Sequence, residues 1–289
     1  MTKMKFTLVR KLDDADSDKV NKIVDRIKIA SQALGWEEVS KFSEAEIIIA
    51  IGGDGTMLHA MKMALSNQGE KSIKVFGFNI GKLGFLSEFD PNSVEKVVID
   101  INNGNFSEDK RDVIRENGTA ILAMNEFTIV PEKSKHVIRY EFFVDGVSSG
   151  SHSANGLIIS TPTGSTAYSL SAGGAILQPN TPVFQITPVA AMTLNSKSVI
   201  VSNCSEIKVK IKLEKGVKYC LTSDGQEVFA FDESVKEDES FMFDFDVFDR
   251  DGNFILTFTK DKSAATLIHS PQWNFFEILH QKLHWNVKI

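Results

Sequence analysis

The sharpest chemical signal in the sequence is a glycine-rich turn with an acidic residue at its centre, Gly-Gly-Asp-Gly-Thr at 52–56. It lies between an apolar run, 47–51, and a stretch with helical spacing. Small residues here let backbone amides approach a polyphosphate, and a helix N-terminus adds partial positive charge. Asp54 could accept a proton from a hydroxyl nucleophile while those amides hold the phosphoryl group. The alternative is a tight turn in which Asp54 only caps the helix.

Two further segments carry polar groups at strand ends. The segment 156–174 begins as an apolar strand and continues as a dense series of hydroxyls and glycines. It suits a nucleotide-binding surface that offers donors without charge, and a plain Ser/Thr loop is the alternative. Asn125 and Glu126 open another strand, where an amide beside a carboxylate can bind a ribose diol or an adenine edge.

Composition and missing motifs exclude several functions. The net charge of −6 comes without a clustered basic surface, so we expect no nucleic-acid partner. No apolar run has the ~20 residues of a membrane span and the first ten residues lack a signal-peptide core, so we expect a cytoplasmic protein. Walker, Gly-x-Gly-x-x-Gly and Gly-x-Ser-x-Gly motifs are absent, and His280 and His284 lack the intervening Glu of a zinc protease. Cys204 and Cys220 are expected to be buried free thiols.

The elements that must position these residues alternate between strand and helix over the first hundred residues. Apolar strands are predicted at 6–9, 47–51 and 73–78, and helical spacing predicts amphipathic helices that end near Gly35 and Gly104. This order, with such apolar strands, is typical of a doubly wound parallel sheet. We therefore predict an α/β domain first.

From about residue 119 a period of two replaces helical spacing, which predicts a β-rich domain. Strands are expected at 137–144 and 207–213, and an acidic, aromatic stretch at 241–251 is interpreted as a half-buried strand and its turn. Asp-Gly pairs begin at Asp145, Asp224 and Asp251, where hairpin turns favour positive φ.

The last stretch, 271–285, returns to helical spacing and could pack back onto the first domain. Its predicted apolar face consists of Trp273, Phe276, Leu279 and Leu283.

Together these motifs resemble those of the NAD kinases, which phosphorylate the 2′-hydroxyl of the adenosine ribose of NAD to make NADP. The resemblance covers nearly the whole chain, and its motifs, besides the glycine-rich turn, lie at 79–86, 125–126, 161–168, 224–226 and 282–285. Related lipid and sugar kinases share the glycine-rich turn, whereas the run Thr-Pro-Thr-Gly-Ser-Thr-Ala-Tyr at 161–168 is close to private to this family. A lipid or sugar kinase and a catalytically weak NAD(P)-binding sensor are the alternatives.

The resemblance implies an α/β nucleotide-binding domain, 1–105 with the returning tail 265–289, and a β-sandwich-like NAD-binding domain of layered sheets, 106–264. It implies ATP and NAD as substrates, Mg²⁺ carried with ATP rather than held in a protein cage, and Asp54 as general base. By resemblance we also expect a homotetramer or homodimer.

It further implies roles for individual residues. Phosphates would be lined by Gly52, Gly53, Gly55 and Thr56, with Asn79 as a further nucleotide-binding candidate. His59 and His136 are candidates for phosphate contact, or else plain surface histidines. Asn125 and Glu126 would bind the adenosine part of NAD, with Phe85 nearby. The remaining dinucleotide contacts would come from Thr163, Thr166, Ala167, Tyr168, Ser171 and Gln226.

Two departures from the family pattern bear on affinity and subunit contacts rather than on chemistry. Asn155 stands where the family usually has Asp, so a contact to the nicotinamide end could persist with altered strength. The segment 188–194 lacks the histidine that the family's Pro-Ile-x-Pro-His-x-Leu segment carries.

Overall fold

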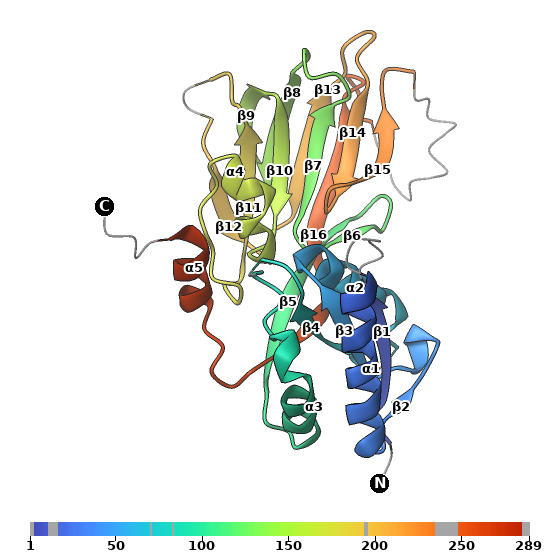
Figure 1. The fold of residues 1–289 in the computed structure, drawn as a ribbon. Helices are drawn as coiled ribbons and strands as arrows, with labels where there is room; N and C mark the ends of the chain where they lie inside the picture. The colour runs from blue at the N-terminus through green and yellow to red at the C-terminus, as the bar shows by residue number, and fades with distance from the viewer. Residues whose placement is uncertain are drawn as a thin grey trace. The chain divides into compact units, whose positions relative to one another are not determined.

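The computed structural model describes residues 3–10, 17–69, 71–82, 84–193, 196–234 and 248–284. The chain divides into two compact units (Figure 1). Unit 1 consists of Met1–Arg111 and Ala264–Ile289, and unit 2 consists of Asp112–Ser263.

Unit 1 is built on a parallel sheet. Its strand order is β2-β1-β3-β4-β16, from β2 (Glu37–Glu38), β1 (Lys5–Arg10), β3 (Ile47–Gly52), β4 (Lys74–Asn79) and the second half of β16 (Phe254–His269). Every pairing in this series is parallel. All six residues of β3 are buried, as expected of a central strand covered on both faces.

Helices cover both faces of this sheet, which confirms the doubly wound prediction. On one face, α1 (Ser17–Ala33) and α3 (Val94–Asn102) share a buried cluster with Ile47, Ile49 and Ile51. On the other face, α2 (Asp54–Asn67) lies against β3 and β4, where a Cβ on Gly77 would come 2.4 Å from Met57 Sδ. One-turn 3₁₀ segments occupy Phe42–Glu44 and Pro91–Ser93.

Unit 2 consists of two antiparallel sheets that share one core, as the predicted sandwich requires. One sheet has the order β12-β11-β10-β7-β14-β15. Its strands are β12 (Val199–Ser202), β11 (Val183–Val189), β10 (Gly156–Ser160), β7 (Glu126–Pro131), β14 (Tyr219–Ser223) and β15 (Gln226–Phe231), and Figure 1 shows β7 beside β10.

The other sheet pairs the first half of β16 with β13 (Ile207–Lys212), β8 (Ile138–Val144) and β9 (Val147–Ala154). The two inner faces meet through aromatic rings, with ring centroids 5.2 Å apart for Phe127 and Phe258 and 4.2 Å apart for Phe231 and Phe254. The remaining elements are β5 (Ser107–Glu116), β6 (Leu122–Ala123), a 3₁₀ turn (Thr163–Thr166) and the short helix α4 (Tyr168–Ser171).

The predictions for the Asp-Gly turns and for the two cysteines were confirmed in part. The Asp-Gly turns at Asp145 and Asp224 have positive φ at both residues, whereas at 251–252 only Gly252 does. Both cysteines are free thiols, but the prediction of burial is wrong for Cys204, which is exposed in the turn after β12. The interpreted strand at 241–247 lies outside the described residues.

The C-terminal tail returns to unit 1 as α5 (Phe275–Leu283). Its predicted apolar face is confirmed only at Leu279, which is buried. The other buried residues are Phe275 and Ile278, and Phe276, which was expected on this face, is 54% exposed. The helix begins after Asn274, whose side chain caps it by accepting from the backbone N–H of Phe276 (2.9 Å).

Among the helices in the described ranges, none is long and apolar enough to cross a membrane.

Packing of α1 on the sheet gives a stability prediction. Ile27 is fully buried, and Ile29 on the same helix is 69% exposed. Ile27→Ala should lower the free energy of unfolding by about 2–5 kcal/mol because it leaves a cavity. Ile29→Ala should change it by less than about 0.5 kcal/mol. Urea unfolding followed by circular dichroism measures both, and equal losses would contradict the packing of this face.

Candidate functional site

In unit 1 the glycine-rich turn joins β3 to α2 and contains Asp54, whose carboxylate is held in place by a later segment of the chain. The helix N-cap is Gly53, which has no side-chain cap, and Asp54 is the first helical residue. The capping alternative for Asp54 is therefore wrong. Its carboxylate instead accepts hydrogen bonds from the backbone N–H groups of three consecutive residues, Phe85 (2.8 Å), Leu86 (2.9 Å) and Ser87 (3.3 Å).

The glycines around Asp54 fall into two kinds. A Cβ on Gly84 would lie 2.0 Å from Asp54 Oδ1, and a Cβ on Gly52 would lie 2.1 Å from Thr56 Oγ1. These two glycines are needed for close packing. Gly53 and Gly55 have nothing within 4 Å of a Cβ, so the backbone beside the carboxylate is open to a ligand.

The other unit 1 candidates have different environments. Asn79 pairs with Gly52 across β3 and β4, and its side chain holds the following loop by donating to Lys82 O (2.9 Å) and accepting from Gly81 N–H (3.0 Å). His59 is exposed on α2, one helical turn after Gly55.

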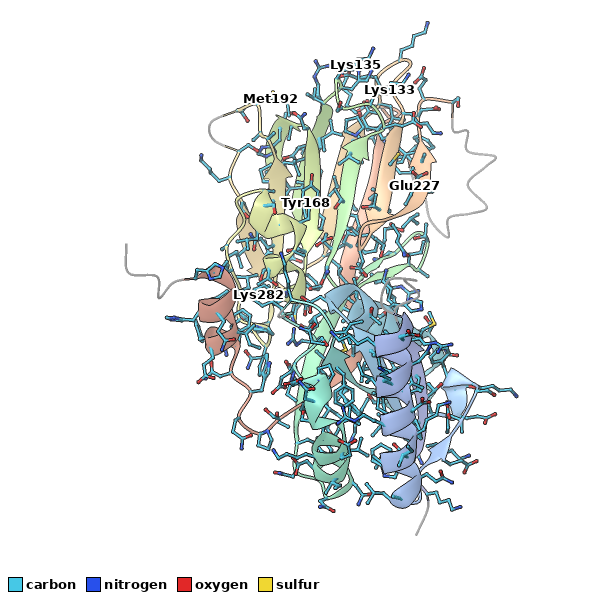
Figure 2. The ribbon with its side chains drawn as sticks, in the orientation of Figure 1. Lys133, Lys135, Tyr168, Met192, Glu227 and Lys282 are labelled. Carbon is cyan, nitrogen blue, oxygen red and sulfur yellow. The ribbon has the colours of Figure 1, made fainter. Side chains whose placement is uncertain are left out.

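The tail helix contributes a side chain for which the sequence analysis proposed no role. Lys282 Nζ lies 3.6 Å from Asp54 Oδ2 and 4.2 Å from the ring centroid of Phe85 (Figure 2 labels Lys282). The Phe85 ring also packs against Phe275, with centroids 6.3 Å apart. Lys282 belongs to a family-like motif, but its proximity to Asp54 is a contact between residues 228 positions apart and has no local signal.

A buried cluster of charges holds the start of this tail. His269, 1% exposed, places Nδ1 3.0 Å from Glu88 and Nε2 3.5 Å from Asp109, and its ring stacks on Trp273 at 4.2 Å. Burial raises the pKa of the Asp109 carboxyl, but hydrogen bonding from His269 and the charge and hydrogen bond of Arg111 outweigh it. The result is a pKa of about 2, below the ordinary 3.8.

In unit 2 a second carboxylate organises the candidate NAD-binding motifs. Asp224 accepts hydrogen bonds from the backbone N–H groups of Met124 (3.1 Å), Asn125 (2.6 Å) and Glu126 (3.2 Å). Thr161 binds the same segment through its N–H to Asn125 O (2.9 Å) and its hydroxyl to Met124 O (2.6 Å). Three motifs far apart in sequence therefore meet at one end of β7.

The residues at this end differ in exposure. Glu126 and Thr163 are buried, and Thr166 and Ala167 are partly exposed. Tyr168, 43% exposed, begins α4 (Figure 2), and Ser171 ends it and is also exposed. Gln226 is exposed at the start of β15, opposite Ser223.

Two predicted unit 2 residues are not brought to this end. The register pairs Ser160 with Glu126, so Asn155 lies at the opposite end of β10, roughly 16 Å away along the strand. Its Oδ1 atom is buried and, within the described residues, has no hydrogen-bond partner. His136 follows β7 in the loop that carries Lys133 and Lys135, at the far tip of unit 2 from Tyr168 (Figure 2).

Comparison with known proteins identifies the family. The ATP-NAD kinase N-terminal domain matches residues 11–106, and the ATP-NAD kinase C-terminal domain matches residues 124–237. The chain belongs to the NAD kinase family. An NAD kinase of Photorhabdus laumondii is 33% identical over 266 residues, which cover 90% of this chain and 82% of that protein. The NAD kinase of Psychrobacter arcticus is 30% identical over 98% of this chain and 81% of its own.

Solved NAD kinases share the fold. The Archaeoglobus fulgidus enzyme in complex with ATP aligns with a TM-score of 0.74 at 23% identity, covering 97% of this chain and 99% of its own. Yeast NADH kinase complexed with NADH aligns with a TM-score of 0.79 at 21% identity, covering 99% and 89%. The α/β unit followed by a β-sandwich is therefore the NAD kinase fold.

The buried cluster beside the tail predicts acid sensitivity. The folded-state pKa of Asp109 lies below its ordinary value, so its contribution to stability is present above pH 4 and is lost as pH falls from about 4 to about 2. Its size is on the order of 2 kcal/mol. Asp109→Asn should remove this contribution and flatten the pH dependence of urea unfolding in that window. Asp25→Asn, at an exposed position on α1, is the control. An unchanged slope for Asp109→Asn would refute the assignment.

Proposed function

We propose that the chain transfers the γ-phosphoryl group of ATP to the 2′-hydroxyl of the adenosine ribose of NAD, with Asp54 as general base. Family membership makes the chain an NAD kinase, an enzyme that makes NADP from NAD and ATP. The position of the hydroxyl and the role of Asp54 are our proposals. The observation that carries them is a carboxylate fixed by three amides beside open glycine backbone.

The proposed base has a carboxylate that is oriented and accessible. An ionised carboxylate is acceptor-only, and three backbone donors hold Asp54 in one orientation. Its side chain remains 35% exposed, so a ribose hydroxyl can reach it. As the hydroxyl oxygen attacks phosphorus, its proton passes to this carboxylate and ADP leaves.

The open turn is the proposed phosphate site. Gly53 and Gly55 present backbone without side chains at the start of α2, where free amides and the helix dipole favour anions. Thr56 packs against Gly52, so it supports the turn from inside.

Mg²⁺ would arrive bound to ATP and neutralise phosphate charge. In the part of the chain that the structure describes, no group of three or more His, Cys, Asp or Glu side chains is arranged to hold a metal ion.

The proposed NAD surface in unit 2 is the end of β7 that Asp224 organises. Asn125 and Glu126 would bind the adenosine, and the exposed ring of Tyr168 can stack on a base. Thr163, Thr166, Ala167, Ser171 and Gln226 complete the candidate set. We keep Asn155 as a candidate for the nicotinamide end because its buried Oδ1 has no partner among the described residues. For His59 and His136 the structure offers only surface and loop positions.

The base role is tested with Asp54→Asn. NADP formation, measured with an NADP-specific dehydrogenase, should fall by roughly 10²–10⁴-fold while ATP still binds. The asparagine NH₂ would face the N–H of Phe85, so some loss of stability is expected, and thermal unfolding and ATP calorimetry must accompany the assay. Asp25→Asn is the matched surface control. Undiminished turnover in a folded Asp54→Asn variant would exclude the base role, and nucleotide binding without turnover in the unmodified protein would favour a sensor.

The phosphate role is tested with two glycines of the same turn. Gly52→Ala should destabilise the fold, because its Cβ would meet Thr56 at 2.1 Å. Gly55→Ala should fold normally, because nothing lies within 4 Å of its Cβ, yet should raise the KM for ATP by roughly tenfold or more by obstructing the phosphates. Thermal unfolding and steady-state kinetics separate the two effects. Normal ATP kinetics in Gly55→Ala would argue against phosphate binding at this turn.

A further inference from the structure

We propose that Lys282, presented by the C-terminal helix, contacts the phosphoryl group that ATP transfers. The inference rests on the proposed function, because it places the ammonium beside the proposed base and phosphate turn. The observations that carry it are the position of Nζ, 3.6 Å from Asp54 Oδ2, and the contacts that hold the helix in place.

The helix that carries Lys282 is well anchored. Asn274 caps its first turn, Phe275, Ile278 and Leu279 are buried, and the Phe275 ring packs against Phe85. Because α5 is fixed at its first turn and along its buried face, the Lys282 side chain extends toward the glycine-rich turn. Its side chain is 25% exposed.

The ammonium has donor capacity left for a ligand. At 3.6 Å it lies beyond normal hydrogen-bond distance from Asp54, whose Oδ2 already accepts from the N–H of Phe85. Its other close partner is the face of the Phe85 ring, at 4.2 Å. Within the described residues the Lys282 ammonium donates no hydrogen bond, although it has three donors. The ion pair with Asp54 and the contact with the Phe85 ring therefore leave the three ammonium donors available to a bound ligand.

A phosphoryl group, which has only acceptor oxygens, is a suitable ligand for these unused ammonium donors. In the transfer, the bond between the 2′-oxygen and phosphorus forms, the bond from phosphorus to the bridging oxygen breaks, and ADP leaves with the electron pair. The proton of the hydroxyl goes to Asp54. Negative charge is spread over the three equatorial oxygens, and a lysine point charge beside them stabilises that charge. The open backbone of Gly53 and Gly55 leaves space for those oxygens near Asp54.

The competing role is that of a counterion which acts only on Asp54. The two roles differ once the aspartate charge is removed. In an Asp54→Asn background a counterion has nothing left to neutralise, so losing it should not affect ATP affinity. A phosphate-binding lysine should still contribute to ATP affinity there.

The experiment compares Lys282→Met with Lys282→Arg, using Lys96→Met as the control for a lost surface charge in unit 1. In Lys282→Met we expect kcat/KM for ATP to fall roughly 100-fold, with the KM for NAD within about twofold and unchanged thermal unfolding. Calorimetry should show weaker ATP binding but unaltered AMP binding, both alone and in the Asp54→Asn background. Lys282→Arg should recover part of the loss, because it keeps the charge.

The inference is overturned if Lys282→Met matches Lys96→Met, if AMP and ATP affinities fall together, or if the ATP effect vanishes in Asp54→Asn. Its failure is distinguishable from failure of the proposed function. If Lys282→Met is fully active while Asp54→Asn is not, only the lysine contact is lost. If the unmodified protein makes no NADP, the proposed function fails first.

Discussion

Two aspartates, one in each unit, bind three consecutive backbone N–H groups, and both candidate surfaces depend on this interaction. Asp54 holds residues 85–87 and Asp224 holds residues 124–126. In each case a carboxylate at a tight turn fixes a segment that the sheet brings alongside. Only an acceptor-only group satisfies three converging donors, because an amide would direct its own N–H at one of them. The same bonds therefore stabilise the fold locally and orient Asp54.

Glycines at the two candidate surfaces have two different uses, and the atoms that surround each glycine decide which use it has. Gly84 and Gly164 let two segments touch, since a Cβ would lie 2.0 Å from Asp54 Oδ1 in one case and 2.1 Å from Asn125 O in the other. Gly53 and Gly55 instead face open space. Close-packed glycines explain how the carboxylate and the β7 end are held rigidly, and open glycines explain where a ligand can approach. A glycine-rich motif alone does not separate these two uses, because the difference lies in the neighbours.

The sequence was sufficient wherever the signal is local. Alternation and helical spacing predicted β1, β3, β4, β8 and β13 and the helices α1 and α3, and the family-like motifs located the glycine-rich turn, whereas β11, β14 and the long β16 were not predicted. The sequence was insufficient where residues far apart in the chain decide which side chains are buried or brought together. The buried face of α5 depends on distant packing partners such as Phe85, which contacts Phe275. The position of Asn155 depends on the register of β10 against β7, and the partners of Asp54 come from a loop some thirty residues away. A motif gives the residue type but not the side chain's distance from another motif.

The buried polar cluster around His269 joins the loop that holds Asp54 to the C-terminal tail of unit 1. Glu88 directly follows the three amides that hold Asp54, and its carboxylate accepts from the backbone N–H of Ser270 (3.1 Å) and lies 3.0 Å from His269. The same stretch of chain leads through Trp273 into the helix that carries Lys282. The loop that orients the carboxylate and the tail that supplies the ammonium are thus fixed to one another at this buried cluster as well as through the contact between Phe85 and Phe275. Because charged groups are costly to bury unless paired, a rearrangement of this cluster would displace both together.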